Sequence, residues 1–194
     1  MKIAIRAALL IVAIVLAYLI YDGIMNKIEF KKLAQTRKDA VIVRLSQIRD
    51  AQKSFKQVKG RYANNFDELI HFVENDSIPI IKAVGTVPDT LTAAKAVELG
   101  IVTRDTTKVP AKTEIFREGF VTDSIQYIPY SGGKKFSMKA DMIEKNKVNV
   151  SVFMASAPYE SFLRGLNTKN ENVNLDAELQ VGSLTEPVIS GNWE

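Results

Sequence analysis

The chain has 194 residues, enough for one hydrophobic core of ordinary size plus an appendage, and its 46% hydrophobic and 25% charged content excludes a globally disordered protein. It contains no cysteine, which excludes disulfides, thiol nucleophiles and thiolate metal sites. Its one histidine, His71, excludes any site that needs two imidazoles, and its formal net charge of +4 is unevenly distributed.

The first segment, MKIAIRAALLIVAIVLAYLIYDG, carries no charged residue over 7–21. Extended back to Ile3, with Arg6 reaching a headgroup, it offers about 19 apolar positions, close to the ~20 that span a bilayer. Tyr21 stands at its end, where aromatic belts form. A cleaved signal peptide is the alternative, but no small-x-small cleavage site follows the apolar run. We therefore expect residues 1–22 to be a retained transmembrane anchor.

A helical pattern continues beyond this anchor, because residues 22–59 contain no proline and Gly23 is their only glycine. Seven positions, spaced alternately by four and three, place a mostly apolar stripe on one face: Ala34, Lys38, Val41, Leu45, Ile48, Gln52 and Phe55. The two polar members interrupt any coiled-coil seam. A head domain that covers the stripe is therefore the better prediction.

The end of this helix is marked by Gly60, a natural C′ residue that follows two lysines in the last turn. The pattern thus predicts one helix from about Ile3 to Lys59, roughly 85 Å long. Its part from 23 to 59 is an amphipathic stalk, and 60–194 form a globular α+β head.

Basic residues concentrate on the stalk. From Lys27 to Tyr62, eleven Lys/Arg stand against three Asp/Glu, a net charge of +8, whereas residues 63–194 carry a net charge of −5. Anionic headgroups near a membrane account for such a surface. No aromatic platform or groove-reading motif accompanies the charge, so we expect membrane lipids as partners and no nucleic acid.

The positive-inside rule leaves the orientation open, since Lys2 and Arg6 stand on one side of the apolar run and Lys27, Lys31 and Lys32 on the other. Positive charge abuts the run directly only at its N-terminal end, as in a signal anchor. We therefore predict a single-pass protein of the inner (cell) membrane with a periplasmic head.

A short motif, Asp-Ser/Thr followed by an apolar residue or Thr, occurs four times. It resembles the O-glycosylation sequon that some Gram-negative bacteria use on exported proteins. The candidate acceptors are Ser77, Thr90, Thr106 and Ser124. The alternative is that these pairs cap helices and start turns.

The first half of the head contains short elements. Asn64 or Asn65 caps a short helix. SIPIIKAV contains Pro79 and is therefore an edge strand or a connector. DTLTAAKAVELG predicts a second short helix that stops at Gly100, and IVTRDTTKVPAKTEIF predicts an exposed, partly extended loop.

Three strands follow in the second half: SIQYIPY, KKFSMKADMIE and KVNVSVFMAS. SGG and EKNK join them into an antiparallel meander whose buried face packs on the stalk. In the third strand the alternation puts Val148, Val150, Val152 and Met154 on one face. APYESFLRGL predicts a third short helix and LQVGSL a further strand. The fold class is α+β, one long helix packed on an antiparallel sheet with short helices.

Candidate catalytic residues are few. His71 lies between two apolar residues of a short helix, where a structural role is the better interpretation. Asp67 and Glu68 complement the dipole of the same helix. YSGGKKF lacks the spacing of a phosphate loop, and no zinc, EF-hand or nucleophile-elbow pattern occurs. We therefore expect no enzyme activity, no cofactor and no metal.

The stalk and the turn after it, RLSQIRDAQKSFKQVKGRYANNFDEL, resemble the corresponding segment of type IV pilins and type II secretion pseudopilins. The resemblance covers about residues 1–75 in pattern and the head in architecture. It implies that Gly60, Tyr62 and Phe66 form the structural turn between helix and head. It also implies a role as subunit of a filament or of an envelope machine.

The N-terminus departs from that family, since Ile5 and Arg6 stand where a glutamate is expected and no prepilin processing site is recognisable. We therefore expect a non-enzymatic, pilin-like structural subunit or an inner-membrane component of a pilus-like or secretion assembly, with other protein subunits as partners. A membrane-anchored periplasmic binding or adaptor module, unrelated to filaments, is the alternative.

Overall fold

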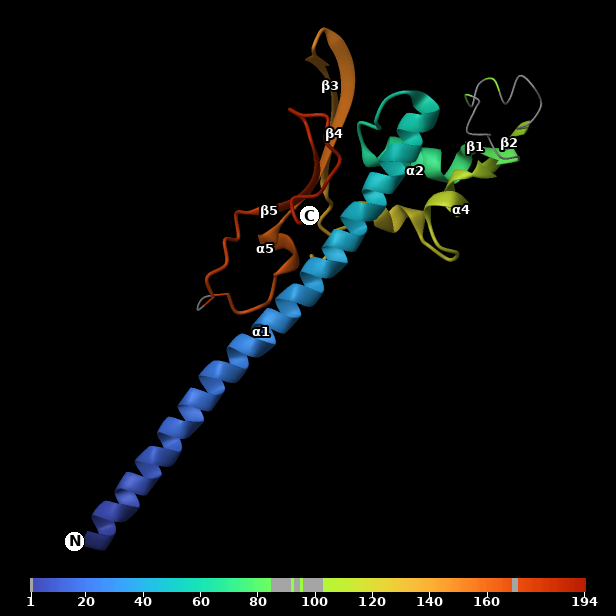
Figure 1. The fold of residues 1–194 in the computed structure, drawn as a ribbon. Coiled ribbons are helices and arrows are strands. Elements are labelled where there is room, and N and C mark those ends of the chain that lie inside the picture. Colours follow the sequence, from blue (N-terminus) through green and yellow to red (C-terminus); the bar gives the residue numbers. More distant parts are fainter. Residues whose placement is uncertain (1, 85–91, 93–94, 96–102, 169–170) are drawn as a thin grey trace.

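In the computed structural model, a single helix, α1 (Lys2–Lys59), runs from the N-terminus into the head (Figure 1). The structure describes residues 2–84, 92, 95, 103–168 and 171–194. The predicted long helix is confirmed, and it ends where expected. Gly60 has a φ of 77°, a left-handed conformation that glycine adopts without strain, and its N–H donates to the carbonyl of Lys56 at 2.8 Å.

The described part of the head contains two antiparallel sheets and several short helices. One sheet pairs β1 (Ser77–Val84) with β2 (Thr103–Pro110), and the other has the order β3 (Ser137–Lys145), β4 (Val148–Pro158), β5 (Glu178–Ser183). The helices of the described head are α2 (Phe66–Asn75), α4 (Ala111–Ile115), the 3₁₀ helix η1 (Thr122–Gln126) and α5 (Tyr159–Phe162). The predicted α+β class, a long helix packed on antiparallel sheets, is confirmed.

The core lies between the C-terminal half of α1 and the head elements. The stripe residues Val41, Leu45 and Ile48 are fully buried, and they belong to one cluster with Phe153 of β4 and Phe72 of α2. Figure 1 shows the head gathered around this half of α1, while the N-terminal half projects away from it. Burial of an amphipathic face, rather than helix propensity, therefore fixes the C-terminal half of α1. The division at residues 22 and 59 into anchor, stalk and head stays a prediction.

The β3–β4 hairpin has the predicted loop. Asn146 and Lys147 connect the strands as a two-residue turn, with φ of 52° and 65°, the backbone that matches the right-handed twist of a hairpin. The third strand of this sheet is β5, which contains LQVGS, and not the predicted strand SIQYIPY. That segment instead forms η1 and one isolated bridge, because Ile125 and Ile128, three residues apart, both enter the core.

The predicted face of β4 is only partly buried: Val152 on it is buried, but the strand's members of the core cluster lie on the opposite face. The side of β4 toward the core cluster carries Phe153, Ala155 and Ala157, while Val148 at the hairpin tip is 60% exposed. Both faces of this central strand are largely apolar, so the alternation of residues along the sequence does not show which face packs on the core cluster. On β3 the predicted face is confirmed, since Met138 packs against the cluster directly opposite Ala155.

The segment interpreted as a loop, IVTRDTTKVPAKTEIF, is also corrected, because it forms β2 and α4. Each strand of a two-stranded sheet is an edge strand, which explains why Pro79 and Pro110 are accommodated. The helix predicted over 89–100 lies outside the described residues except for 92 and 95. The third predicted short helix is present as α5 but spans only Tyr159–Phe162.

Candidate functional site

The turn that follows α1 is fastened to the helix by a buried glutamine. Gln52 is fully buried, and its amide pairs with both backbone polar groups of Ala63. Its Nε2 donates to the Ala63 carbonyl at 2.9 Å, while its Oε1 accepts from the Ala63 N–H at 2.8 Å. Because Ala63 is also fully buried, these bonds satisfy backbone groups that water does not reach.

Tyr62 connects the same turn to the three-stranded sheet. Its N–H donates to Ser151 Oγ at 3.1 Å, and its ring packs on that of Phe153 with centroids 4.6 Å apart. The Lys56 ammonium lies 4.6 Å from the centroid of the Tyr62 ring. The predicted turn residue Tyr62 therefore lies between α1 and β4, where it joins the end of the stalk to the head.

Phe66 opens α2 with its side chain buried in the core. Asn65 is the N-cap, as predicted, and its side chain accepts from the N–H of Glu68 at 2.8 Å. The Glu68 carboxylate accepts from the Asn64 N–H at 2.9 Å and pairs with the guanidinium of Arg61. The hydrogen bond from Arg61 is the main cause that lowers the pKa of Glu68, and the same pair raises the pKa of Arg61.

Sequence reasoning missed the two polar residues that hold this turn. In the sequence, Gln52 interrupts the apolar stripe, and Ser151 lies on the face of its strand opposite the predicted valine face. The available signal was a lone amide among buried positions, which requires a partner. Gln52 and Ala63 are eleven residues apart, on either side of the chain reversal at Gly60, so only the folded structure shows that they pair.

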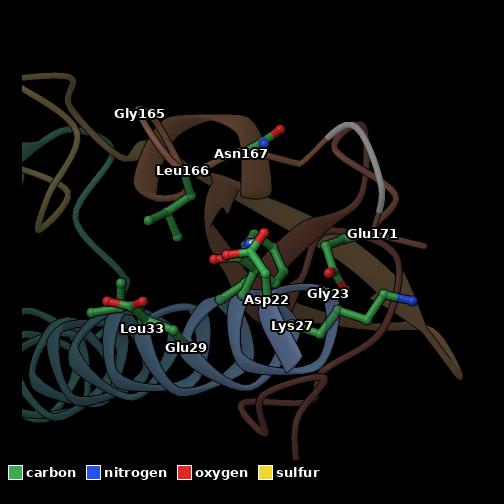
Figure 2. Close-up of a pocket in the computed structure, with 11 residues that line it drawn as sticks. Asp22, Gly23, Lys27, Glu29, Leu33, Gly165, Leu166, Asn167 and Glu171 are labelled. Atoms are coloured by element: carbon green, nitrogen blue, oxygen red, sulfur yellow. Dashed lines mark hydrogen bonds between the residues drawn. The ribbon is translucent and has the colours of Figure 1, made fainter. Parts of the chain in front are cut away.

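A second feature lies at the base of the head, where a loop of residues 163–168 lies beside α1. A cleft of about 490 Å³ separates the helix from this loop, and Figure 2 shows Asp22 and Leu166 facing each other across it. The described lining residues are Asp22, Gly23, Asn26, Lys27, Glu29, Phe30, Leu33, Gly165, Leu166, Asn167 and Glu171. The cleft therefore lies beside the helix segment that follows the apolar run.

Arg37 fastens this loop to the helix. Its Nη1 donates to the carbonyls of Phe162, at 3.0 Å, and Arg164, at 2.8 Å. Its guanidinium also lies 5.3 Å from the centroid of the Tyr130 ring. The basic side chain thus satisfies carbonyls at the end of α5 and orders the head against the stalk.

Above the cleft, an apolar groove of about 400 Å³ runs between α1 and α5. Its lining consists mainly of hydrophobic residues with lysines along α1: Phe30, Lys31, Ala34, Gln35, Lys38, Tyr159, Phe162, Leu163 and Val173. Such a groove suits an apolar side chain or a short amphipathic segment of a partner.

The four candidate O-glycosylation residues lie in different surroundings. Ser77 and Thr106 are exposed on the ribbon formed by β1 and β2, where the register places them on one face. Ser124 is half-buried, and its Oγ donates to the Val121 carbonyl at 2.6 Å and accepts from Arg44 at 3.0 Å. Thr90 lies outside the described residues. Whether any of them is modified stays a prediction.

Two residues considered above as candidates for catalysis, His71 and Glu68, lie on the same side of α2. His71 is exposed, and it lines a cleft of about 350 Å³ with Glu68 and Asp76. Both carboxylates are engaged in ion pairs, Glu68 with Arg61 and Asp76 with Lys59, the latter at 2.9 Å. Within the residues that the structure describes, no group of three His, Cys, Asp or Glu is placed to hold a metal ion.

Comparison with known proteins found no match: no family model, no curated protein and no solved structure corresponds to this chain. The architecture is pilin-like in that a long, apolar N-terminal helix packs on antiparallel sheets.

Proposed function

We propose that this protein is a non-enzymatic, pilin-like structural component of an envelope assembly, anchored in the inner membrane by α1 with its head in the periplasm. Membrane lipids and other protein subunits of that assembly are its proposed partners. Its bound partners, rather than a chemical reaction, would define its role.

One observation carries the proposal: the same helix serves as an apolar rod and as the core of the head. Leu9 and Ile14 are 64% and 61% exposed, whereas Val41 and Leu45, further along the helix, are fully buried. By length and composition, α1 is apolar enough to cross a membrane. A head built on such a rod cannot move independently of the span, a property that suits a scaffold.

The attachment of the head supports this role. Gln52 and Arg37 each bridge α1 to head segments, the first near the C-terminal end of the helix and the second near the base of the head. Each makes two hydrogen bonds to backbone atoms, so head and helix are held at two separate levels. A structural subunit that transmits position or force requires such a connection.

The test is gentle extraction of the tagged full chain from native membranes, followed by native electrophoresis and identification of the co-purifying proteins. The proposal expects a particle much larger than the 21.6 kDa chain, containing further copies or other envelope proteins. Monomers without partners, seen by electron microscopy as well, would refute it. Protease accessibility of the head in spheroplasts tests the periplasmic orientation separately.

A second candidate, a membrane-anchored binding or adaptor module, is favoured by the apolar groove between α1 and α5. Replacing Ala34, which lines this groove, by arginine would fill it with charge. An adaptor whose ligand occupies the groove would lose that ligand while keeping its fold. A structural subunit that assembles through other surfaces would still enter the large particle.

A further inference from the structure

We propose that three lysines at the foot of the stalk, Lys27, Lys31 and Lys32, bind the phosphate groups of anionic phospholipids in the leaflet next to the head. These three residues are called the lysine collar below. The inference rests on the proposed membrane anchoring, because it needs α1 to cross the bilayer. It adds the class of lipid that the helix recognises, and it holds for either orientation of the head.

The position of the lysine collar along α1 places it close to the expected membrane surface. At ~1.5 Å per residue, Lys27 lies about 9 Å beyond Tyr21 and the other two lysines about 15 to 17 Å beyond it. The headgroup layer is roughly 5 to 8 Å thick. Lys27 is therefore within reach of the headgroups, and the backbone of Lys31 and Lys32 lies roughly 7 to 12 Å above that layer, comparable to one Debye length of ~8 to 10 Å.

The direction of the side chains strengthens this placement. In an α-helix the Cα–Cβ bonds tilt toward the N-terminus, and long side chains lie over the preceding turn. The N-terminus of α1 is the proposed membrane end. The lysines of the collar therefore lean toward the bilayer, and their aliphatic stems allow the ammonium groups to extend further in that direction.

Within the described residues none of the three lysines forms an ion pair, although Asp22, Glu29 and Glu171 line the same cleft as Lys27. All three lysines are exposed. Basic residues higher on α1 differ, since Arg49 pairs with Glu194 and Lys59 with Asp76. The described part of the head thus supplies no ion-pair partner to the lysine collar.

Lys27 and Lys31, four residues apart, lie on the same side of α1, and Lys32 lies on another. Lys27 lines the cleft beside the loop of residues 163–168, Lys31 lines the apolar groove, and Lys32 follows about 100° further around the helix. Headgroups approaching from two sides of the helix therefore meet an ammonium group. A lysine near an anionic bilayer surface contributes ~1 kcal/mol, which corresponds to roughly a fivefold preference.

The experiment measures lipid selectivity with the full chain in phosphatidylcholine bilayers. Spin-labelled phosphatidylglycerol or phosphatidylcholine is added in trace amounts, and the motionally restricted fraction gives the relative association of each lipid. For the wild type we expect at least the roughly fivefold preference for phosphatidylglycerol that one engaged lysine supplies. This preference should largely vanish at 1 M salt, where the Debye length is ~3 Å.

The decisive variant is K27Q/K31Q/K32Q, which should lose most of the preference and keep only the part that Lys2 and Arg6 supply at the other end of the span. Its matched control is K112Q/K139Q/K145Q, which removes three exposed lysines from the head and should keep the preference. No preference in the wild type, or an equal loss in both variants, overturns the inference. Failure of the wild type to co-float with the vesicles would instead refute the membrane anchoring itself. Far-UV circular dichroism checks that the variants fold.

Discussion

Replacing the buried Gln52 by leucine removes the polar connection between α1 and the turn after it. The N–H and carbonyl of Ala63 then lose partners that are 2.8 and 2.9 Å away, in a place that water does not reach. Each unsatisfied backbone group costs ~1–3 kcal/mol, and burying leucine returns ~1.5 kcal/mol or more. We expect a net destabilisation of about 2 to 3 kcal/mol, or ~5–10 °C in Tm.

The assay is urea unfolding of the full chain in detergent micelles, followed by the fluorescence of Trp193, which packs against the core and is the only tryptophan. The matched control is Gln57→Leu, an exposed glutamine of the same helix whose hydrogen bond to the Pro79 carbonyl is long, at 3.4 Å, and open to water. The control should stay within about 0.5 kcal/mol of the wild type. Equal stability of both variants would refute the inference that Gln52 fastens the turn.

Three further predictions concern the turn and the head surface. Gly60→Ala should lower stability by about 1 kcal/mol in the same assay, because alanine is strained at a φ of 77°, and an unchanged midpoint would argue against a left-handed cap. Arg61 lowers the pKa of Glu68 in the folded protein. The pair therefore stabilises the fold fully above the unfolded pKa of about 4.3, and this stabilisation is lost as the pH falls through the lower pKa of the folded state. Glu68→Gln should therefore cost under ~1 kcal/mol at pH 7 and make the urea midpoint less sensitive to acid; an equally steep acid dependence would count against the pair. Peptide mapping of protein from its native cells should place any O-glycan on exposed Ser77 and not on the hydrogen-bonded Ser124, whereas modification of Ser124 alone would contradict the accessibility argument.

The long helix could be predicted because its pattern is local and strongly periodic. The buried residues Val41, Leu45, Ile48 and Phe55 repeat at helical spacing, and Gly60 supplies the stop. The hairpin between β3 and β4 was predictable for a similar reason, since two strand-like runs enclose a short polar loop.

Other elements depended on pairings distant in the sequence. The segment TRDTTKVP has no apolar face of its own, and it becomes β2 through the ladder with β1. Around Ile125, the alternation of apolar and polar residues also fits the 3₁₀ helix that the core selects. For β4, only the packing of Phe153 on Tyr62 shows which of two apolar faces is inside.

The residues of the candidate site also fall into two groups, those that the sequence indicated and those whose contacts depend on the fold. The sequence indicated the turn residues Gly60, Tyr62 and Phe66 through the resemblance to pilins, and it indicated the basic character of the stalk. It did not indicate that Gln52 pairs with Ala63, or that Arg37 holds the loop beside the foot of α1. Both contacts join residues brought together by the chain reversals of the head.

The proposed function requires that α1 is one rigid helix, which carries the head directly above the bilayer. The chain has no cysteine, so a labelled pair can be introduced at Tyr21 and Asp39, two exposed positions on either side of Gly23. Eighteen residues are five full turns, which places both spin labels on one face about 27 Å apart. Electron–electron distance measurements on the full chain in bilayers should give one narrow distribution near that value. A broad or much shorter distribution would show a hinge between span and stalk and would contradict the account.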